Sequence, residues 1–200
     1  MLDIKNLRTP LIGPVSFSVS EGECVAILGP SGSGKSLLLR AVADLDPNEG
    51  EVRLGTRERD RMPANIWRQA VALVPAESGW WTDRVADHFD PDHEAGPMLA
   101  AVGLPEAMGW QVSRLSTGER HRLAIVRALC RAPKGILLDE PTAALDDEAT
   151  AAIEALITEQ CRQGAAVILV THDRDQAQRL AARRLLMERG QLRPEAEAAA

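Results

Sequence analysis

The chain of 200 residues is 45% hydrophobic, which is enough for one substantial core and gives no reason to expect a second independent domain. Its 23 Lys and Arg residues against 29 Asp and Glu residues give a net charge of −6, which argues against a nucleic-acid-binding surface, so no nucleic-acid partner is expected. The longest apolar run, near residues 165–170, is far shorter than the roughly 20 residues that span a bilayer, and the N-terminus lacks the apolar segment of a secretory signal.

Short apolar runs alternate with helical patterns along the chain, which is typical of a doubly wound sheet with several parallel strands. The pattern predicts an antiparallel side sheet at residues 2–7, 15–19 and 51–54, buried strands at 24–28, 71–74, 136–139 and 167–171, and helices at 34–43, 119–131 and 147–163. Residues 80–113 predict a small, mainly helical insert, and residues 189–190 a turn between short strands at 185–187 and 191–192.

The first candidate site is a glycine-rich loop. Residues 29–36 read GPSGSGKS, which matches the pattern G-x-x-x-x-G-K-[ST] between an apolar strand and a helical stretch. In such a loop, successive backbone N–H groups and the following helix N-terminus bind phosphate oxygens; an ordinary Gly-rich turn is the alternative. We expect Lys35 to bridge the β- and γ-phosphates of a nucleotide and Ser36 to offer its hydroxyl to Mg²⁺. The residues expected to contact the nucleotide are Gly29, Pro30, Ser31, Gly32, Ser33, Gly34, Lys35, Ser36 and Leu37.

Two later strands also end in polar residues. The apolar run at 136–138 leads into Asp139 and Glu140, and the carboxyl ends of such strands form the binding edge of an open α/β sheet. Alternation along an extended chain allows Asp139 to face a metal ion while Glu140 faces the attacking water. His172 follows the strand at 167–171, and we expect it to touch the γ-phosphate or the water, a structural histidine being the alternative.

Residues 116–119 form a third candidate site. Ser116-Thr117-Gly118-Glu119 predicts a capping box at the start of a helix. The N-terminus of such a helix is an anion site if it is exposed. A capped helix without any further role is the alternative.

Together these motifs resemble the ATP-binding cassette (ABC) ATPases, the nucleotide-binding subunits of ABC transporters, from residue 1 to about residue 190. The most specific similarity is LSTGE at residues 115–119, which resembles the family's signature sequence and precedes ILLDEPT at 136–142. The resemblance implies the α/β fold of a P-loop NTPase of the ABC type, with a mostly parallel core sheet, helices on both faces, an antiparallel side sheet and a short helical insert. We therefore expect a single domain over residues 1–193, with the insert at about 77–132 and a flexible tail at 194–200.

The resemblance also implies an activity, the hydrolysis of ATP with Mg²⁺, whose catalytic positions would be held here by Lys35, Glu140 and His172. In the family, two copies sandwich two ATP molecules head to tail, so the second copy's nucleotide would be contacted by Ser116, Gly118 and Glu119. The implied role is to drive a transporter together with an integral membrane permease subunit. The implied location is cytoplasmic, peripheral on the cytoplasmic face of the membrane.

Two departures from the family pattern concern the metal and the signature. Ala76 stands where the family has a Gln that reaches Mg²⁺, so we expect the neighbouring Glu77 to join Ser36 and Asp139 at the metal, with water in its place as the alternative. The signature has Thr117 and Glu119 where Gly and Gln are commoner, and Glu119 still fits the capping box.

A third departure concerns aromatic residues. None lies between residues 6 and 15, where the family places a ring against adenine. Arg8 is the candidate substitute, because a guanidinium plane stacks on any purine, or else it is a solvated strand end. Stacking of this kind predicts little discrimination between ATP and GTP.

Two adjacent tryptophans stand at the start of the insert. At least one of Trp80 and Trp81 is expected to face outward as an anchor for a partner helix. The alternative is that one packs on the main domain and the other lies flat on the surface.

Two other functions stay open at this level. One is a soluble ABC ATPase of a non-transport assembly, such as iron–sulfur assembly, although the sequence shows neither the coiled-coil insertions of the repair proteins nor the second cassette of the translation type. The other is a nucleotide-gated binding module with weak turnover, which Ala76 favours and the intact Glu140 disfavours.

Overall fold

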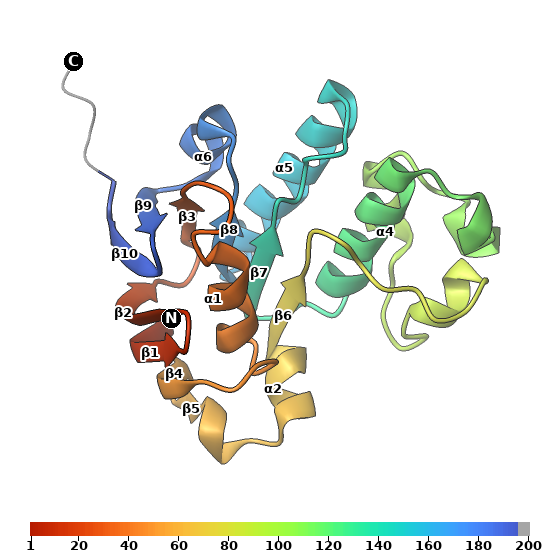
Figure 1. Cartoon of the computed structure of the whole chain (residues 1–200). Helices are drawn as coiled ribbons and strands as arrows, with labels where there is room; N and C mark the ends of the chain where they lie inside the picture. The colour runs from red at the N-terminus through yellow and green to blue at the C-terminus, as the bar shows by residue number, and fades with distance from the viewer. Residues whose placement is uncertain (196–200) are drawn as a thin grey trace.

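The computed structural model describes residues 1–195 of the chain, which form two β-sheets flanked by helices (Figure 1). The smaller sheet is antiparallel and has the strand order β2-β1-β4-β5. Its strands are β1 (Leu2–Thr9), β2 (Ile12–Val19), β4 (Glu49–Leu54) and β5 (Arg57–Glu58). Leu2 and Ile4 of β1 are buried on one face, as in an antiparallel sheet that lies on a core. The side sheet expected from the sequence is confirmed.

The larger sheet has the strand order β10-β9-β3-β8-β7-β6 and is parallel except for the β9–β10 pair. Its strands are β3 (Cys24–Leu28), β6 (Val71–Val74), β7 (Gly135–Asp139), β8 (Ala166–Val170), β9 (Arg183–Glu188) and β10 (Gln191–Pro194). Every residue of β3, β7 and β8 is buried, because both faces of a parallel sheet are covered.

Two hydrophobic cores cover the two faces of the larger sheet. Along β8, Ile168 packs in the first core and Val167 in the second, since successive side chains of a strand point to opposite faces. The first core joins the sheet to the side sheet, to α1 (Lys35–Val42) and to Trp67 of α2 (Ala64–Ala70). The second joins it to α5 (Asp147–Arg162) and to the segment between β6 and β7, while α6 (Arg174–Leu180) contacts β3.

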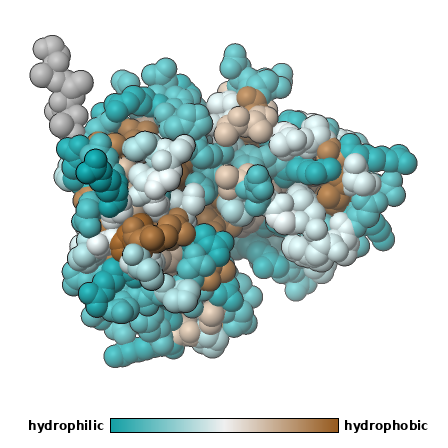
Figure 2. Space-filling model, in the orientation of Figure 1, coloured by the Kyte–Doolittle hydropathy of each residue, from teal (hydrophilic) through white to brown (hydrophobic). Residues whose placement is uncertain are grey.

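The segment between β6 and β7 forms a lobe of its own. It holds 3-10 turns at Val85–His88, Ala107–Gly109 and Val112–Arg114, and the helices α3 (Gly96–Ala101) and α4 (Thr117–Leu129). In Figure 1 this lobe, coloured yellow to green, lies on the opposite side of the molecule from the red and orange side sheet. Figure 2, in the orientation of Figure 1, shows a largely hydrophilic face with a hydrophobic patch over the half that carries the side sheet and a smaller one on the lobe.

Three features were not expected from the sequence. The helices α2 and α6 are short and bury few side chains, so they show no clear apolar period. The strand β9 pairs in parallel with β3, and so extends the core sheet in addition to forming a hairpin with β10. The strand β10 reaches Pro194, and Glu195 accepts a 2.8 Å hydrogen bond from Arg184 Nε, so ordered structure continues into the segment expected as a tail; residues 196–200 of that segment lie outside the described residues.

No helix within residues 1–195 is long and apolar enough to cross a bilayer.

Candidate nucleotide site

The glycine-rich loop connects β3 to α1 at the carboxyl edge of the larger sheet, as predicted. Gly29 and Gly34 have φ angles of 147° and 106°, which side-chain-bearing residues rarely adopt. A Cβ atom at Gly29 would also collide with the carbonyl oxygen of Met187. Lys35 Nζ donates hydrogen bonds of 2.8 and 3.1 Å to the carbonyl oxygens of Gly29 and Pro30, so the ammonium group lies under the loop.

A cavity of about 320 Å³ lies in front of this loop. It is lined by Ser31, Gly32, Gly34, Lys35, Ser36, Leu37, Ala76, Asp139 and Glu140. The loop, the lysine, the hydroxyl of Ser36 and the two carboxylates at the end of β7 therefore share one cavity. Helix α1 directs its N-terminus toward this cavity, which favours bound phosphate.

The two carboxylates reach the cavity in a way the sequence did not predict. Asp139 ends β7 and is buried, but the chain does not continue extended at Glu140, whose φ angle of 51° is in the left-handed region. A left-handed non-glycine residue costs about 1–2 kcal/mol, and such residues are concentrated at functional sites. The turn lets both side chains line the same cavity, whereas plain alternation would send them to opposite faces of the sheet.

His172 lies beside Glu140. The register of the parallel pair β7–β8 sets Asp139 opposite Val170, so the residues that follow the two strands become neighbours. Glu140 Oε2 lies 2.8 Å from His172 Nδ1, and it also accepts a 3.3 Å hydrogen bond from the backbone N–H of His172. The histidine side chain is 72% exposed and that of Glu140 is 21% exposed, so the pair reaches from the cavity to the surface.

The signature residues form the predicted capping box at the start of α4. Glu119 N donates a 3.3 Å hydrogen bond to Ser116 Oγ, and Glu119 Oε2 accepts bonds of 2.8 Å from both the backbone N–H and the hydroxyl of Ser116. The hydrogen bonds from Ser116 hold the pKa of the Glu119 carboxyl below its usual value. None of these groups lines the cavity at the phosphate loop of the same chain. Instead, Leu115 and Glu119 line a separate cavity of about 580 Å³.

The structure does not bring Glu77 to the phosphate loop. Ala76 lines the loop cavity, but Glu77 lines only a neighbouring cavity of about 290 Å³, which also contacts Thr117 and His121 of α4. The two residues lie in a bend after β6, and only Ala76 of the two lines the loop cavity. Of the two explanations for the missing Gln, the arrangement favours water over Glu77.

Arg8 does not line the loop cavity and is paired within the side sheet. Its Nε donates a 2.9 Å hydrogen bond to Glu49 Oε2, and its terminal nitrogen forms a second contact with the same oxygen. The two residues face each other in the β1–β4 register, and both are largely exposed. Arg8 is therefore an exposed, ion-paired residue of the side sheet. This arrangement resembles the alternative given above, in which Arg8 is a solvated strand end.

The turn between β9 and β10 is a part of the site that the sequence analysis missed. Gly190 N donates a 3.0 Å hydrogen bond to the carbonyl oxygen of Ser33, and Gly190 O accepts a 2.8 Å bond from Gly13 N. These bonds tie the phosphate loop to the turn and to the β1–β2 hairpin. The Arg-Gly pair marked the turn in the sequence, but nothing in it indicated that the turn supports the loop.

Comparisons with known proteins identify the family to which the chain is similar. A sequence model described as ABC transporter matches residues 12–143. A sulfate/thiosulfate import ATP-binding protein of Chromobacterium violaceum is 38% identical over 88% of this chain and 52% of its own length. An aliphatic sulfonates import ATP-binding protein of Paracoccus denitrificans is 40% identical, covering 90% of this chain and 72% of that protein. The glutamine transport ATP-binding protein of Escherichia coli is 30% identical, covering 96% of this chain and 89% of that protein.

The chain spans only about half the length of some of these relatives, such as the sulfate/thiosulfate protein, of which it covers 52%. A solved structure described as the ATP binding subunit of an ABC transporter superposes with a TM-score of 0.87 at 23% sequence identity, covering 96% of this chain and 89% of that chain, which shows a shared fold. The family match covers the phosphate loop, the signature and the two carboxylates. The chain therefore belongs to the ABC ATPase family.

Proposed function

We propose that the chain hydrolyses ATP to ADP and phosphate and thereby drives a transporter, through the ATP-dependent head-to-tail pairing of two copies. The observation that carries this proposal is the set of groups around the loop cavity: Lys35 and the backbone N–H groups for phosphate, and the Glu140–His172 pair for water. Family membership supports nucleotide binding, and the import ATP-binding relatives support a transport role.

Phosphate binding falls to the loop. Its backbone N–H groups, the N-terminus of α1 and the ammonium group of Lys35 supply the positive potential that β- and γ-phosphates need. The donors at Ser36 and Asp139 fit Mg²⁺, since both offer hard oxygen atoms to the same cavity. When bound, the ion would neutralise part of the charge on the phosphate oxygens.

Hydrolysis needs a water molecule in line with the γ-phosphorus. The Glu140 carboxylate accepts a hydrogen bond from this water, orients it, and takes up its proton as the water oxygen bonds to phosphorus and the bond to the β–γ bridging oxygen breaks. His172 orients that carboxylate through the contact between its Nδ1 and Glu140 Oε2. The bridging-oxygen electrons leave with ADP, whose charge Lys35 stabilises.

The start of α4 is assigned to the second copy's nucleotide. Ser116, Gly118 and Glu119 lie outside the loop cavity of their own chain, although the capped helix end is a ready anion site. Two copies arranged head to tail would set each capped end against the γ-phosphate held by the other. Turnover per subunit should then rise with protein concentration, and a turnover independent of dilution would contradict the proposal.

Substitutions of Ser116 separate capping from nucleotide contact. Ser116→Ala removes a cap worth about 1 kcal/mol and the contact, whereas Ser116→Asp keeps a good cap but sets a carboxylate against the γ-phosphate. We expect Ser116→Asp to unfold at nearly the wild-type temperature and yet lose turnover at least as severely as Ser116→Ala. Full turnover in Ser116→Asp, measured beside a thermal melt, would reduce Ser116 to a helix cap.

The dependence of the ATPase rate on Mg²⁺ concentration tests whether residue 76 or residue 77 reaches the metal ion. Since Glu77 does not line the loop cavity, Glu77→Ala should leave the Mg²⁺ titration of the ATPase rate unchanged within about twofold. Ala76→Gln adds an amide oxygen at the cavity wall and should lower the Mg²⁺ concentration needed for half-maximal rate. A shifted Mg²⁺ profile in Glu77→Ala, with none in Ala76→Gln, would return Glu77 to the metal site.

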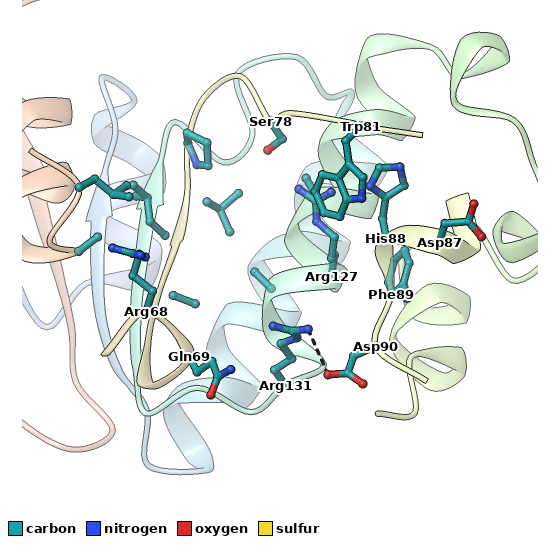
Figure 3. Close-up of a pocket in the computed structure, with 18 of the residues that line it drawn as sticks. Arg68, Gln69, Ser78, Trp81, Asp87, His88, Phe89, Asp90, Arg127 and Arg131 are labelled. Atoms are coloured by element: carbon teal, nitrogen blue, oxygen red, sulfur yellow. Dashed lines mark hydrogen bonds and ion pairs between the residues drawn. The ribbon is translucent and has the colours of Figure 1, made fainter. Parts of the chain in front are cut away.

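The transport partner is assigned to a groove between the lobe that follows β6 and the part of the chain that carries α1 and α2. This groove, about 630 Å³ in volume, lies between the end of α1, the α2–β6 segment and α4 (Figure 3). Trp81 is 69% exposed at its edge and packs edge-on against His88, with the Arg127 guanidinium 5.2 Å from its ring centre. Trp80 is half-buried against the lobe, so one tryptophan of the pair faces outward, as expected. An exposed, laterally supported indole beside a groove fits a partner helix, and we assign that helix to a membrane permease subunit.

A further inference from the structure

The second cavity next to the signature helix has no role in the mechanism above, and its lining differs from that of the loop cavity. Its volume is about 580 Å³, within the usual range for small-molecule sites. It is lined by Gly109, Trp110, Gln111, Arg114, Leu115 and Glu119. An indole ring stacks on a nucleobase, and a guanidinium group adds a cation–π contribution. The loop cavity offers neither, because its lining carries no aromatic side chain and no arginine.

The two stacking groups are available for a ligand. Trp110 is half-buried, and Arg114 is exposed and forms no ion pair with any residue in the part of the chain that the structure describes. By contrast, Arg8, the expected base-stacking residue, is committed to Glu49. The cavity also adjoins the helix end capped by Ser116, through its wall residues Leu115 and Glu119.

The backbone under the cavity is firmly held, so the lining is formed before any ligand arrives. Asp83 accepts hydrogen bonds of 2.8 Å from Val112 N through its carbonyl oxygen and from Ser113 N through its carboxylate. The carbonyl oxygen of Trp110 accepts a 3.1 Å bond from Val85 N. These bonds join the segment before the signature to the start of the insert, and a preorganised surface loses less entropy on binding.

We infer that Trp110 and Arg114 form the binding surface for the purine base and ribose of the ATP molecule held by a second copy of the chain. This inference rests on the proposed head-to-tail pairing. In that arrangement the γ-phosphate of the partner's nucleotide lies at the Ser116 helix end, and the rest of the nucleotide extends along the adjoining surface. Each ATP is therefore held by its phosphates in one copy and by its base in the other. The partner's Trp110 would then take the place of the aromatic side chain that the family places against adenine and that is absent from residues 6–15.

Dimer formation in the Glu140→Gln background provides the first test. Trp110→Ala and Arg114→Ala should each raise the ATP concentration for half-maximal dimer by about tenfold, the effect of losing one base-stacking group. ATP affinity of the isolated subunit, measured at low protein concentration, should not change. Trp110→Phe keeps an aromatic ring, so its ATP concentration for half-maximal dimer should stay close to that of the parent. Arg61→Ala, which removes an exposed arginine far from the cavity in sequence, serves as the matched control.

The outcomes distinguish this inference from the proposal on which it rests. If Glu140→Gln alone fails to dimerise with ATP, the pairing itself is wrong. If it dimerises and both cavity variants require the same ATP concentration as the parent, the pairing stands and the base-binding role is overturned. A loss of ATP affinity in the isolated subunit would place the base in the same chain as its phosphates, and would also overturn the inference.

Mixed dimers give a second, independent test. A Trp110→Ala subunit mixed with a Lys35→Ala subunit keeps one composite site, built from an intact loop and the partner's intact cavity. Wild type mixed with the Lys35→Ala, Trp110→Ala double variant has an intact loop but faces an altered cavity. When each pair is joined in one tandem polypeptide, so that no homodimers form, the first pair should turn over ATP at subsaturating concentration about tenfold faster than the second. Equal rates, or the reverse order, would contradict base binding by the partner copy.

Discussion

Glu140→Gln is expected to reduce ATP turnover by about 10²- to 10⁴-fold, the usual contribution of a positioned general base. The amide is nearly isosteric with the carboxylate but cannot accept the proton of the attacking water. The phosphate loop and Lys35 are untouched by the change, so ATP affinity should be retained. Because hydrolysis then no longer ends the ATP-bound state, the variant should accumulate as a dimer with ATP.

Size-exclusion chromatography with and without ATP measures that accumulation, and a radiolabelled-phosphate assay measures the turnover. ADP in place of ATP is the matched control and should leave the variant monomeric. Wild-type turnover in Glu140→Gln would remove Glu140 from the base position. A variant that stays monomeric with ATP at high protein concentration would contradict the head-to-tail pairing while leaving the role of Glu140 intact.

Lys35→Ala should fail one step earlier, at nucleotide binding. The ammonium group is buried under the loop, where it donates to the carbonyl oxygens of Gly29 and Pro30, and charge-assisted hydrogen bonds to phosphate at this position are worth about 1.5–3 kcal/mol. We expect ATP affinity to fall by about 10- to 100-fold, with turnover falling further.

Isothermal titration calorimetry of Lys35→Ala against Lys134→Ala measures this difference, since Lys134 is an exposed lysine remote from the loop cavity. A thermal melt of both variants checks that the fold survives. Unchanged ATP affinity in a folded Lys35→Ala protein would contradict the assignment of the loop as the phosphate site.

The parts of the fold predicted from the sequence are those with strong local signals. The buried strands β3 and β6 match their predicted residues, because each is a short apolar run bounded by turn or polar residues. The phosphate loop carries its own backbone requirement, seen in the positive φ angles of Gly29 and Gly34, and the capping box at Ser116 is a four-residue pattern. Local chemistry of this kind does not depend on what the rest of the chain does.

The features that were missed depend on contacts between distant segments. The parallel pairing of β9 with β3, and the hydrogen bond from Gly190 to Ser33, join residues more than a hundred positions apart. The left-handed turn at Glu140 is set by the strand next to it, since Glu140 N donates to Val170 O. The ion pair of Arg8 with Glu49 was missed for the same reason, because Glu49 lies on another strand and shows no local signal; base stacking by Arg8 stays a prediction.

The position of β3 in the larger sheet has a consequence for how the protein is made. This strand emerges early from the ribosome, but its neighbours are β8 and β9, and the loop that follows it is tied down by Gly190. At typical elongation rates the apolar strand waits on the order of ten seconds for its neighbours to be synthesised. Its two unpaired edges are open to aggregation throughout that time. Nascent chains should therefore need shielding by chaperones, and they should acquire nucleotide binding only when nearly all of the chain has been translated.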